Sequence, residues 1–165
     1  MQAKVTELKA EQAQTDVLIK AAQEFAWAAA KAGQNPPHSV AKWQEVERLW
    51  QQAIERLEGI PVGSSSYVAA QKLLATYQVN LGTVQTRSQA EQESLEALER
   101  AQSYIESLLA NTPTDAASLD LNYTISHLQE IINELKRVQN GTTAYPEAQH
   151  LLLSAQNKLN QLQTP

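Results

Sequence analysis

The feature that most constrains this chain is an apolar repeat that runs without a break from Tyr67 to Leu109. Apolar residues recur there at alternating spacings of three and four, the pattern of a helix with one apolar face. No proline interrupts the repeat, although polar side chains occupy its middle at Ser88 and Glu91. The register predicts one continuous helix over residues 65–110.

Short segments rich in proline, glycine and asparagine divide the rest of the chain, at 33–37, 59–63, 111–115 and 140–143. Between them Ala, Leu, Gln and Glu dominate, and these residues favour helices. Together these signals predict helices at 3–33, 39–58, 65–110, 116–138 and 144–163. Gly33 and Gly59 suit the left-handed conformation that often ends a helix.

The chain also aligns with itself. Residues 53–81 match 131–159 without gaps at ten identical positions, and residues 5–25 match 84–104 when the alignment slips by one residue. This self-similarity predicts two tandem units, 5–83 and 84–162, each reading helix, loop, helix, loop, helix. The expected fold is all-α: two antiparallel three-helix bundles that share one long central helix, as in spectrin-type arrays.

Composition and motifs exclude several classes of function. The formal net charge of −5 argues against a nucleic-acid binder, and the absence of cysteine excludes disulfides and thiolate metal sites. No metalloprotease, phosphate-loop or hydrolase motif occurs, so we expect no catalytic residues and no cofactor. His127 and Glu130 form an isolated His-x-x-Glu pair, which leaves a metal-binding bundle as an open alternative.

Two resemblances cover part of the chain. The spacing of Ala53, Pro61 and Tyr67 resembles the junction between two tetratricopeptide units, although no 34-residue period exists. Continued to Arg87, the same stretch is similar to a helical segment of uncharacterised cyanobacterial proteins, often beside a membrane anchor. That resemblance implies no catalytic residues, and it implies that any membrane contact lies outside this chain.

We therefore expect a non-enzymatic helical repeat module that scaffolds, spaces or docks proteins inside a larger protein. A tetratricopeptide-like peptide-binding adaptor is the alternative. The compartment stays undetermined.

The two units differ most at their first turn, where the first unit alone has the expected partner surface: Trp27, Pro36, Pro37, His38 and Trp43. The competing interpretation is that both tryptophans fill the core. The acidic residues near the middle of the long helix predict a solvated face, namely Glu91, Glu93, Glu96 and Glu99.

Overall fold

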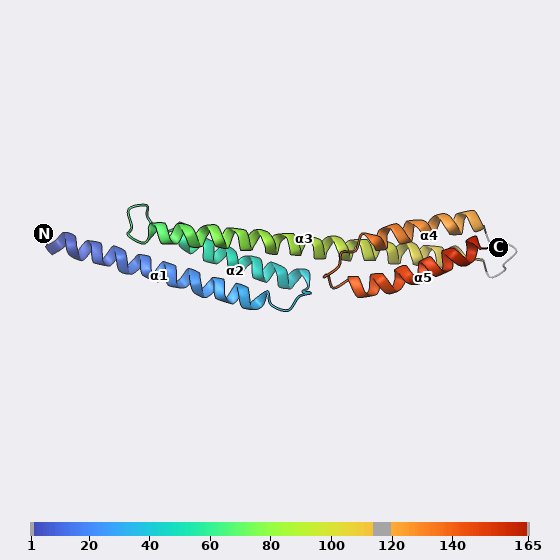
Figure 1. Ribbon diagram of the computed structural model, residues 1–165, viewed down its shortest axis with the longest axis horizontal. Coiled ribbons are helices and arrows are strands. Elements are labelled where there is room, and N and C mark those ends of the chain that lie inside the picture. The colour runs from blue at the N-terminus through green and yellow to red at the C-terminus, as the bar shows by residue number, and fades with distance from the viewer. Residues whose placement is uncertain (1, 114–119, 165) are drawn as a thin grey trace. The chain divides into compact units, whose positions relative to one another are not determined.

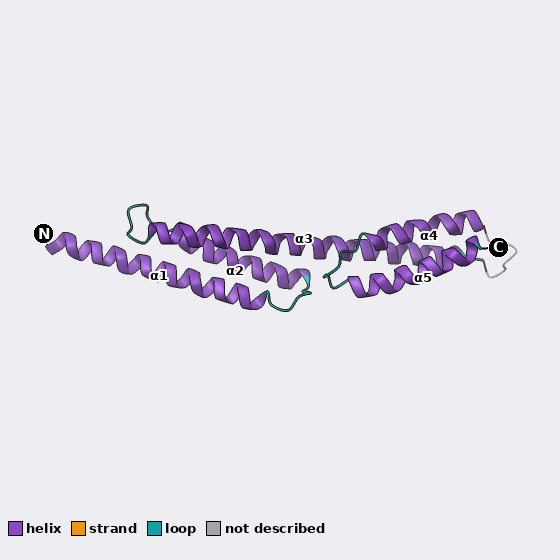
Figure 2. Cartoon of the chain, viewed as in Figure 1, coloured by secondary structure: helices purple, strands orange, loops and turns teal. Residues whose placement is uncertain are grey.

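The computed structural model describes residues 2–113 and 120–164, and within them it is built from helices joined by short loops (Figure 2). The helices are α1 (Gln2–Ala32), α2 (Val40–Glu58), α3 (Tyr67–Asn111), α4 (Leu121–Lys136) and α5 (Tyr145–Gln163). No β-strand occurs in these described ranges. The expected all-α fold is confirmed.

Helix α3 is continuous over 45 residues, which corresponds to about 67 Å at 1.5 Å per residue. The chain divides into two compact units, and α3 contributes to both. The first unit is the chain up to Asn35 together with Ser39–Ser88, and the second is Pro36–His38 together with the chain from Gln89 onward. Tandem three-helix bundles that share one helix are therefore the architecture. The repeat boundaries 5–83 and 84–162 stay a prediction.

In the first unit, α1, α2 and the first part of α3 lie side by side, and successive helices run in opposite directions (Figure 1). Small side chains of α1 meet large ones of α2: Ala22, Ala26 and Ala29 against Trp43, Val46, Trp50 and Leu57. Trp50 also contacts Tyr77 of α3, with ring centroids 5.3 Å apart, a spacing typical of favourable aromatic pairs. Burial raises the pKa of the Tyr77 hydroxyl. This core is built on aromatic residues.

In the second unit, the last part of α3 packs with α4 and α5 around an aliphatic core. Its most buried large side chains are Ile131 and Leu135 of α4, at 1 % and 0 % exposure. Arg100 of α3 donates to Glu134 of α4 at 2.9 Å, and this hydrogen bond raises the pKa of Arg100. The two units therefore share a plan of three helices but fill it with different side chains.

The helix ends follow the loop signals, except for the conformation of two glycines. Ser39 caps α2 by accepting from the Lys42 N–H at 3.2 Å, and Asp120 caps α4. Residues 116–119 of the predicted fourth helix lie outside the described residues. The left-handed ends predicted at Gly33 and Gly59 are wrong, since Gly59 has φ −73° and its N–H still bonds to Glu55. Left-handed backbone occurs at Asn35 and Gly141 instead.

No helix in the described part of the chain is both long enough and apolar enough to span a bilayer.

Gly82 lies inside α3, and a Cβ atom added there would meet nothing within 4 Å. Close packing therefore does not require this glycine, and alanine is the better helix former by about 1 kcal/mol. Gly82→Ala should raise the free energy of unfolding by up to about that amount, measured by urea denaturation. Gly141→Ala is the matched opposite case, because its φ of +86° strains any L side chain and should lower stability. A destabilising Gly82→Ala would contradict a regular helix at this position.

Candidate interaction surface

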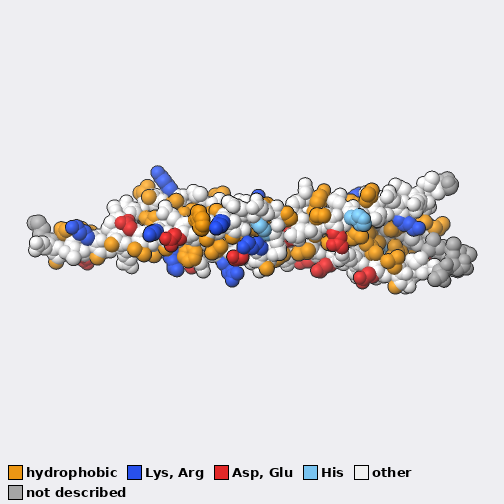
Figure 3. Space-filling model, turned by 90° about the horizontal axis from the view of Figure 1, so that it is seen from below, with side chains coloured by type: hydrophobic (Ala, Val, Ile, Leu, Met, Phe, Trp, Pro, Cys, Tyr) orange, Lys and Arg blue, Asp and Glu red, His pale blue; other side chains and the backbone are white. Residues whose placement is uncertain are grey.

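The most exposed aromatic side chain of the first unit lies on the side of α1 turned away from the core. Five exposed residues recur at spacings of three and four along this side and are called here the outer face of α1: Val17, Lys20, Glu24, Trp27 and Lys31. Val17 and Trp27 are each 66 % exposed. Figure 3 shows apolar, basic and acidic side chains interspersed over one side of the molecule. The outer face thus combines apolar area with charge.

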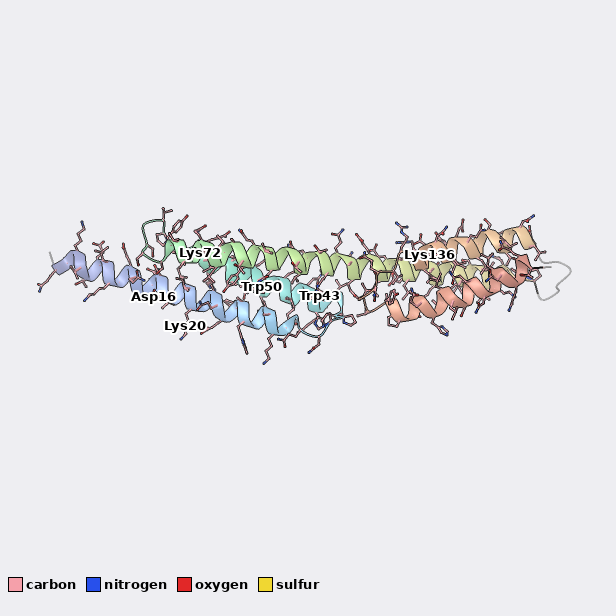
Figure 4. The ribbon with its side chains drawn as sticks, viewed as in Figure 1. Asp16, Lys20, Trp43, Trp50, Lys72 and Lys136 are labelled. Carbon is pink, nitrogen blue, oxygen red and sulfur yellow. The ribbon has the colours of Figure 1, made fainter. Side chains whose placement is uncertain are left out.

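Trp27 is positioned by its neighbours rather than covered by them. The Lys31 ammonium lies 5.0 Å from the centroid of its ring, within cation–π range. A shallow hollow, open to solvent, adjoins the ring among Lys20, Gln23, Glu24 and Ala28 of the same helix. Figure 4 shows Lys20 on the side of α1 away from α2. The uncovered indole can therefore receive an apolar group, with ammonium groups close by.

Trp43 lies elsewhere. It is 4 % exposed, and the Arg87 guanidinium lies 5.6 Å from its ring centroid. Figure 4 places Trp43 and Trp50 along the same helix, α2. Because a buried ring offers no area to a partner, Trp43 is a core residue, and the expectation that it belongs to the partner surface is corrected.

The loop after α1 contributes Pro36 and Pro37, which are exposed, and His38, which is half-buried. These residues group with the second unit, whereas Trp27 groups with the first. The structure therefore does not bring the five predicted residues together on one unit. The candidate surface is confined to the outer face of α1.

His127, one of the pair that suggested a metal site, is engaged locally. Its Nδ1 lies 2.9 Å from the Tyr123 carbonyl oxygen, and the His127 and Tyr123 rings are 3.9 Å apart. Within residues 2–113 and 120–164, no three His, Asp or Glu side chains converge as a metal ion requires. The described side chains thus offer no metal centre to build on.

Glu91 is the largest departure from the sequence-based expectation. It was expected on a solvated face, but its side chain is 1 % exposed. The carboxylate accepts the Thr143 N–H at 2.9 Å and also the Thr143 hydroxyl, while the neighbouring Ser94 hydroxyl accepts the Gln139 N–H at 2.9 Å. These bonds give acceptors to two backbone N–H groups of the loop between α4 and α5. A loop backbone has few such partners of its own, because it lies outside the helices. The sequence signal for its burial is its position in the apolar register of α3, because a polar side chain at a buried position needs a hydrogen-bond partner.

The first unit holds its own loop in a similar way. Gln12 of α1 donates to the Ser66 hydroxyl at 3.1 Å and accepts the Ser65 hydroxyl. Thr15, which is 3 % exposed, accepts the Ser64 hydroxyl at 3.5 Å. In both units, therefore, two polar residues on the first helix fasten the loop between the second and third helices.

Replacing Glu91 tests this fastening. Glu91→Ala should lower the free energy of unfolding by about 2–3 kcal/mol, because the Thr143 N–H and hydroxyl lose a charged acceptor. Glu91→Gln should cost less than about 1 kcal/mol, since an amide can still accept the N–H and donate to the hydroxyl oxygen. Urea denaturation and amide exchange at Thr143 are the measurements.

Glu93→Ala is the matched control, because Glu93 lies on the same helix but is exposed. Its change in stability should stay within about 0.5 kcal/mol. Equal stability losses for the two alanine variants would contradict the structural role of Glu91.

Comparison of the chain with protein-family models, with curated proteins and with solved structures finds no match.

Proposed function

We propose that this chain is a non-enzymatic helical repeat module that binds a partner protein through the outer face of α1. The observation that carries the proposal is Trp27, a large apolar ring that is 66 % exposed on an ordered helix. Tryptophan is among the residues that contribute most to protein–protein affinity. Because it has few rotatable bonds, and Lys31 already lies over its ring, little conformational freedom is lost on binding.

The outer face also suggests the chemistry of the partner. Lys31 lies one helical turn after Trp27, Glu24 about one turn before it, and Lys20 two turns before it. A helix or extended segment with an apolar side chain for the hollow and carboxylates for the lysines would be complementary. Electrostatic complementarity of this kind sets orientation and association rate more than affinity. The apolar contact at Trp27 would supply most of the binding energy.

We further infer that the two units are copies of one ancestral unit, and the loop-fastening residues support this. Gln12 and Glu91 are 79 residues apart, as are Thr15 and Ser94. The loop residues that Gln12 and Glu91 hold, Ser65 and Thr143, are 78 apart, whereas Ser64 and Gln139, which bond to Thr15 and Ser94, are 75 apart. The one-residue difference between 79 and 78 is the same slip that the self-alignment of the sequence contains. A module of this kind presents one scaffold twice and varies its surface.

Replacing Trp27 separates docking from core filling. Trp27→Ala should change the free energy of unfolding by less than about 0.5 kcal/mol, as exposed substitutions usually do. Trp50→Ala should cost about 3–5 kcal/mol, because it empties the core. Urea denaturation of both variants is the measurement. A loss at Trp27 as large as that at Trp50 would rule out docking through this ring.

The binding test uses a photoreactive amino acid in place of Gln23, beside the indole. A partner cross-linked at this position and then purified should bind Trp27→Ala at least tenfold more weakly, the loss expected of a contact worth about 1.4 kcal/mol. Val79→Ala is the matched control, because Val79 is 69 % exposed on another helix of the same unit. Equal affinity of the partner for the wild type, Trp27→Ala and Val79→Ala would contradict the proposal.

A further inference from the structure

A second feature lies in the second unit, between α3, α4 and α5. It is an apolar cavity of about 460 Å³. Its walls include three buried side chains, Leu108, Leu128 and Ile131. Protein interiors normally contain few voids larger than a water molecule, whereas pockets of about 300–1,000 Å³ are typical of ligand sites. The cavity is partly open to solvent, and its size lies within the range of ligand sites.

The hydroxyl hydrogens in the cavity lining are already used in hydrogen bonds within the protein. The hydroxyls of Thr112, Thr124 and Ser154 each donate to the carbonyl oxygen four residues earlier, at 2.6, 2.9 and 3.1 Å. A polar group buried in the cavity would therefore lose its hydration without gaining a hydrogen-bond donor. The part of an occupant that enters must be apolar.

Lys158 of α5 is the exception. It is the only charged side chain among the described lining residues, and it is exposed at the edge of the cavity. No ion pair joins it to any residue of 2–113 or 120–164. An ammonium beside an apolar cavity is complementary to an amphiphile that has one negative end. The occupant should carry a single anionic group.

The corresponding place in the first unit is narrower: a hollow of about 280 Å³ lies there, and its lining includes Ala29, Trp50 and Asn80. This comparison rests on the repeat inferred above, with its spacing of 78 residues. Trp50 and Tyr77, which contact each other in the first core, correspond to Leu128 and Ala155 in the cavity wall. On α3, the lining residues of the second unit are larger than their counterparts on α1, as Leu108 is than Ala29, and they narrow the cavity without filling it. Lys158 corresponds to Asn80. The second unit thus has aliphatic side chains in place of the aromatic pair, a larger space of about 460 Å³, and Lys158 in place of Asn80, although Arg87 also lines the hollow of the first unit.

We propose that this cavity binds a single-chain fatty acid. The alkyl chain lies among the aliphatic side chains, and the carboxylate stays in solvent beside the Lys158 ammonium. Burial of the alkyl chain supplies the binding energy, because apolar surface of both the ligand and the cavity wall is removed from water. The ammonium orients the ligand and favours the anion over an uncharged chain of the same length.

Calorimetric titration of the full chain with dodecanoate tests the proposal. We expect one site per chain. Ala155→Tyr and Leu128→Trp, which restore the residues of the first unit, should each weaken binding at least tenfold while the protein keeps its helical content and melting temperature. Two variants are used so that a failure of one to fold leaves the other as the test.

Lys158→Gln should weaken dodecanoate at least fivefold but leave dodecanol, the uncharged chain, unchanged. Lys136→Gln is the matched control, because Lys136 is exposed on the same unit and does not line the cavity (Figure 4). Trp27→Ala should bind dodecanoate normally, so this test is independent of partner docking. Absence of saturable binding, wild-type affinity in the folded filling variants, or equal affinity for dodecanol and dodecanoate would each overturn the proposal.

Discussion

The continuity of α3 is the constraint on which the rest of the structure depends. One helix supplies a wall to two cores, so its apolar stripe must stay in register over 45 residues. The stripe changes to polar residues where one unit gives way to the next. Glu91 and Ser94 occupy this part of the stripe, and both are buried and hydrogen-bonded to the loop between α4 and α5. The polar interruption thus fixes a loop without breaking the helix.

The two cores solve the same packing problem differently. In the first unit alanines on α1 allow close approach of α2, and the aromatic rings of Trp50 and Tyr77 fill the remaining volume. In the second unit leucine and isoleucine occupy the wall, and Ala155 stands where an aromatic ring would be needed. The space between the helices is larger in the second unit, about 460 Å³, than at the corresponding place in the first, about 280 Å³.

The proposed binding properties follow from these differences. The first unit, with an aromatic core, offers an outward-facing ring at Trp27. The second unit, with an incompletely filled core, offers an inward cavity edged by Lys158. In both units the loop between the second and third helices is hydrogen-bonded to the first helix. Two bundles of one plan can in this way carry the two proposed binding properties, because these loop bonds do not involve the side chains proposed to bind.

The sequence by itself determines the helices, because apolar spacing and the glycine and proline breaks are local signals. The predicted ends of the first, second, third and fifth helices differ from the observed ones by no more than two residues. It also determines that α3 is unbroken. The apolar register already aligns Glu91 with the buried stripe of α3. The tertiary structure alone decides that its carboxylate meets Thr143, that Trp27 is left uncovered, and that a cavity lies beside Ala155. Each of these depends on which side chains of three helices meet, and a pattern along one helix does not contain that information.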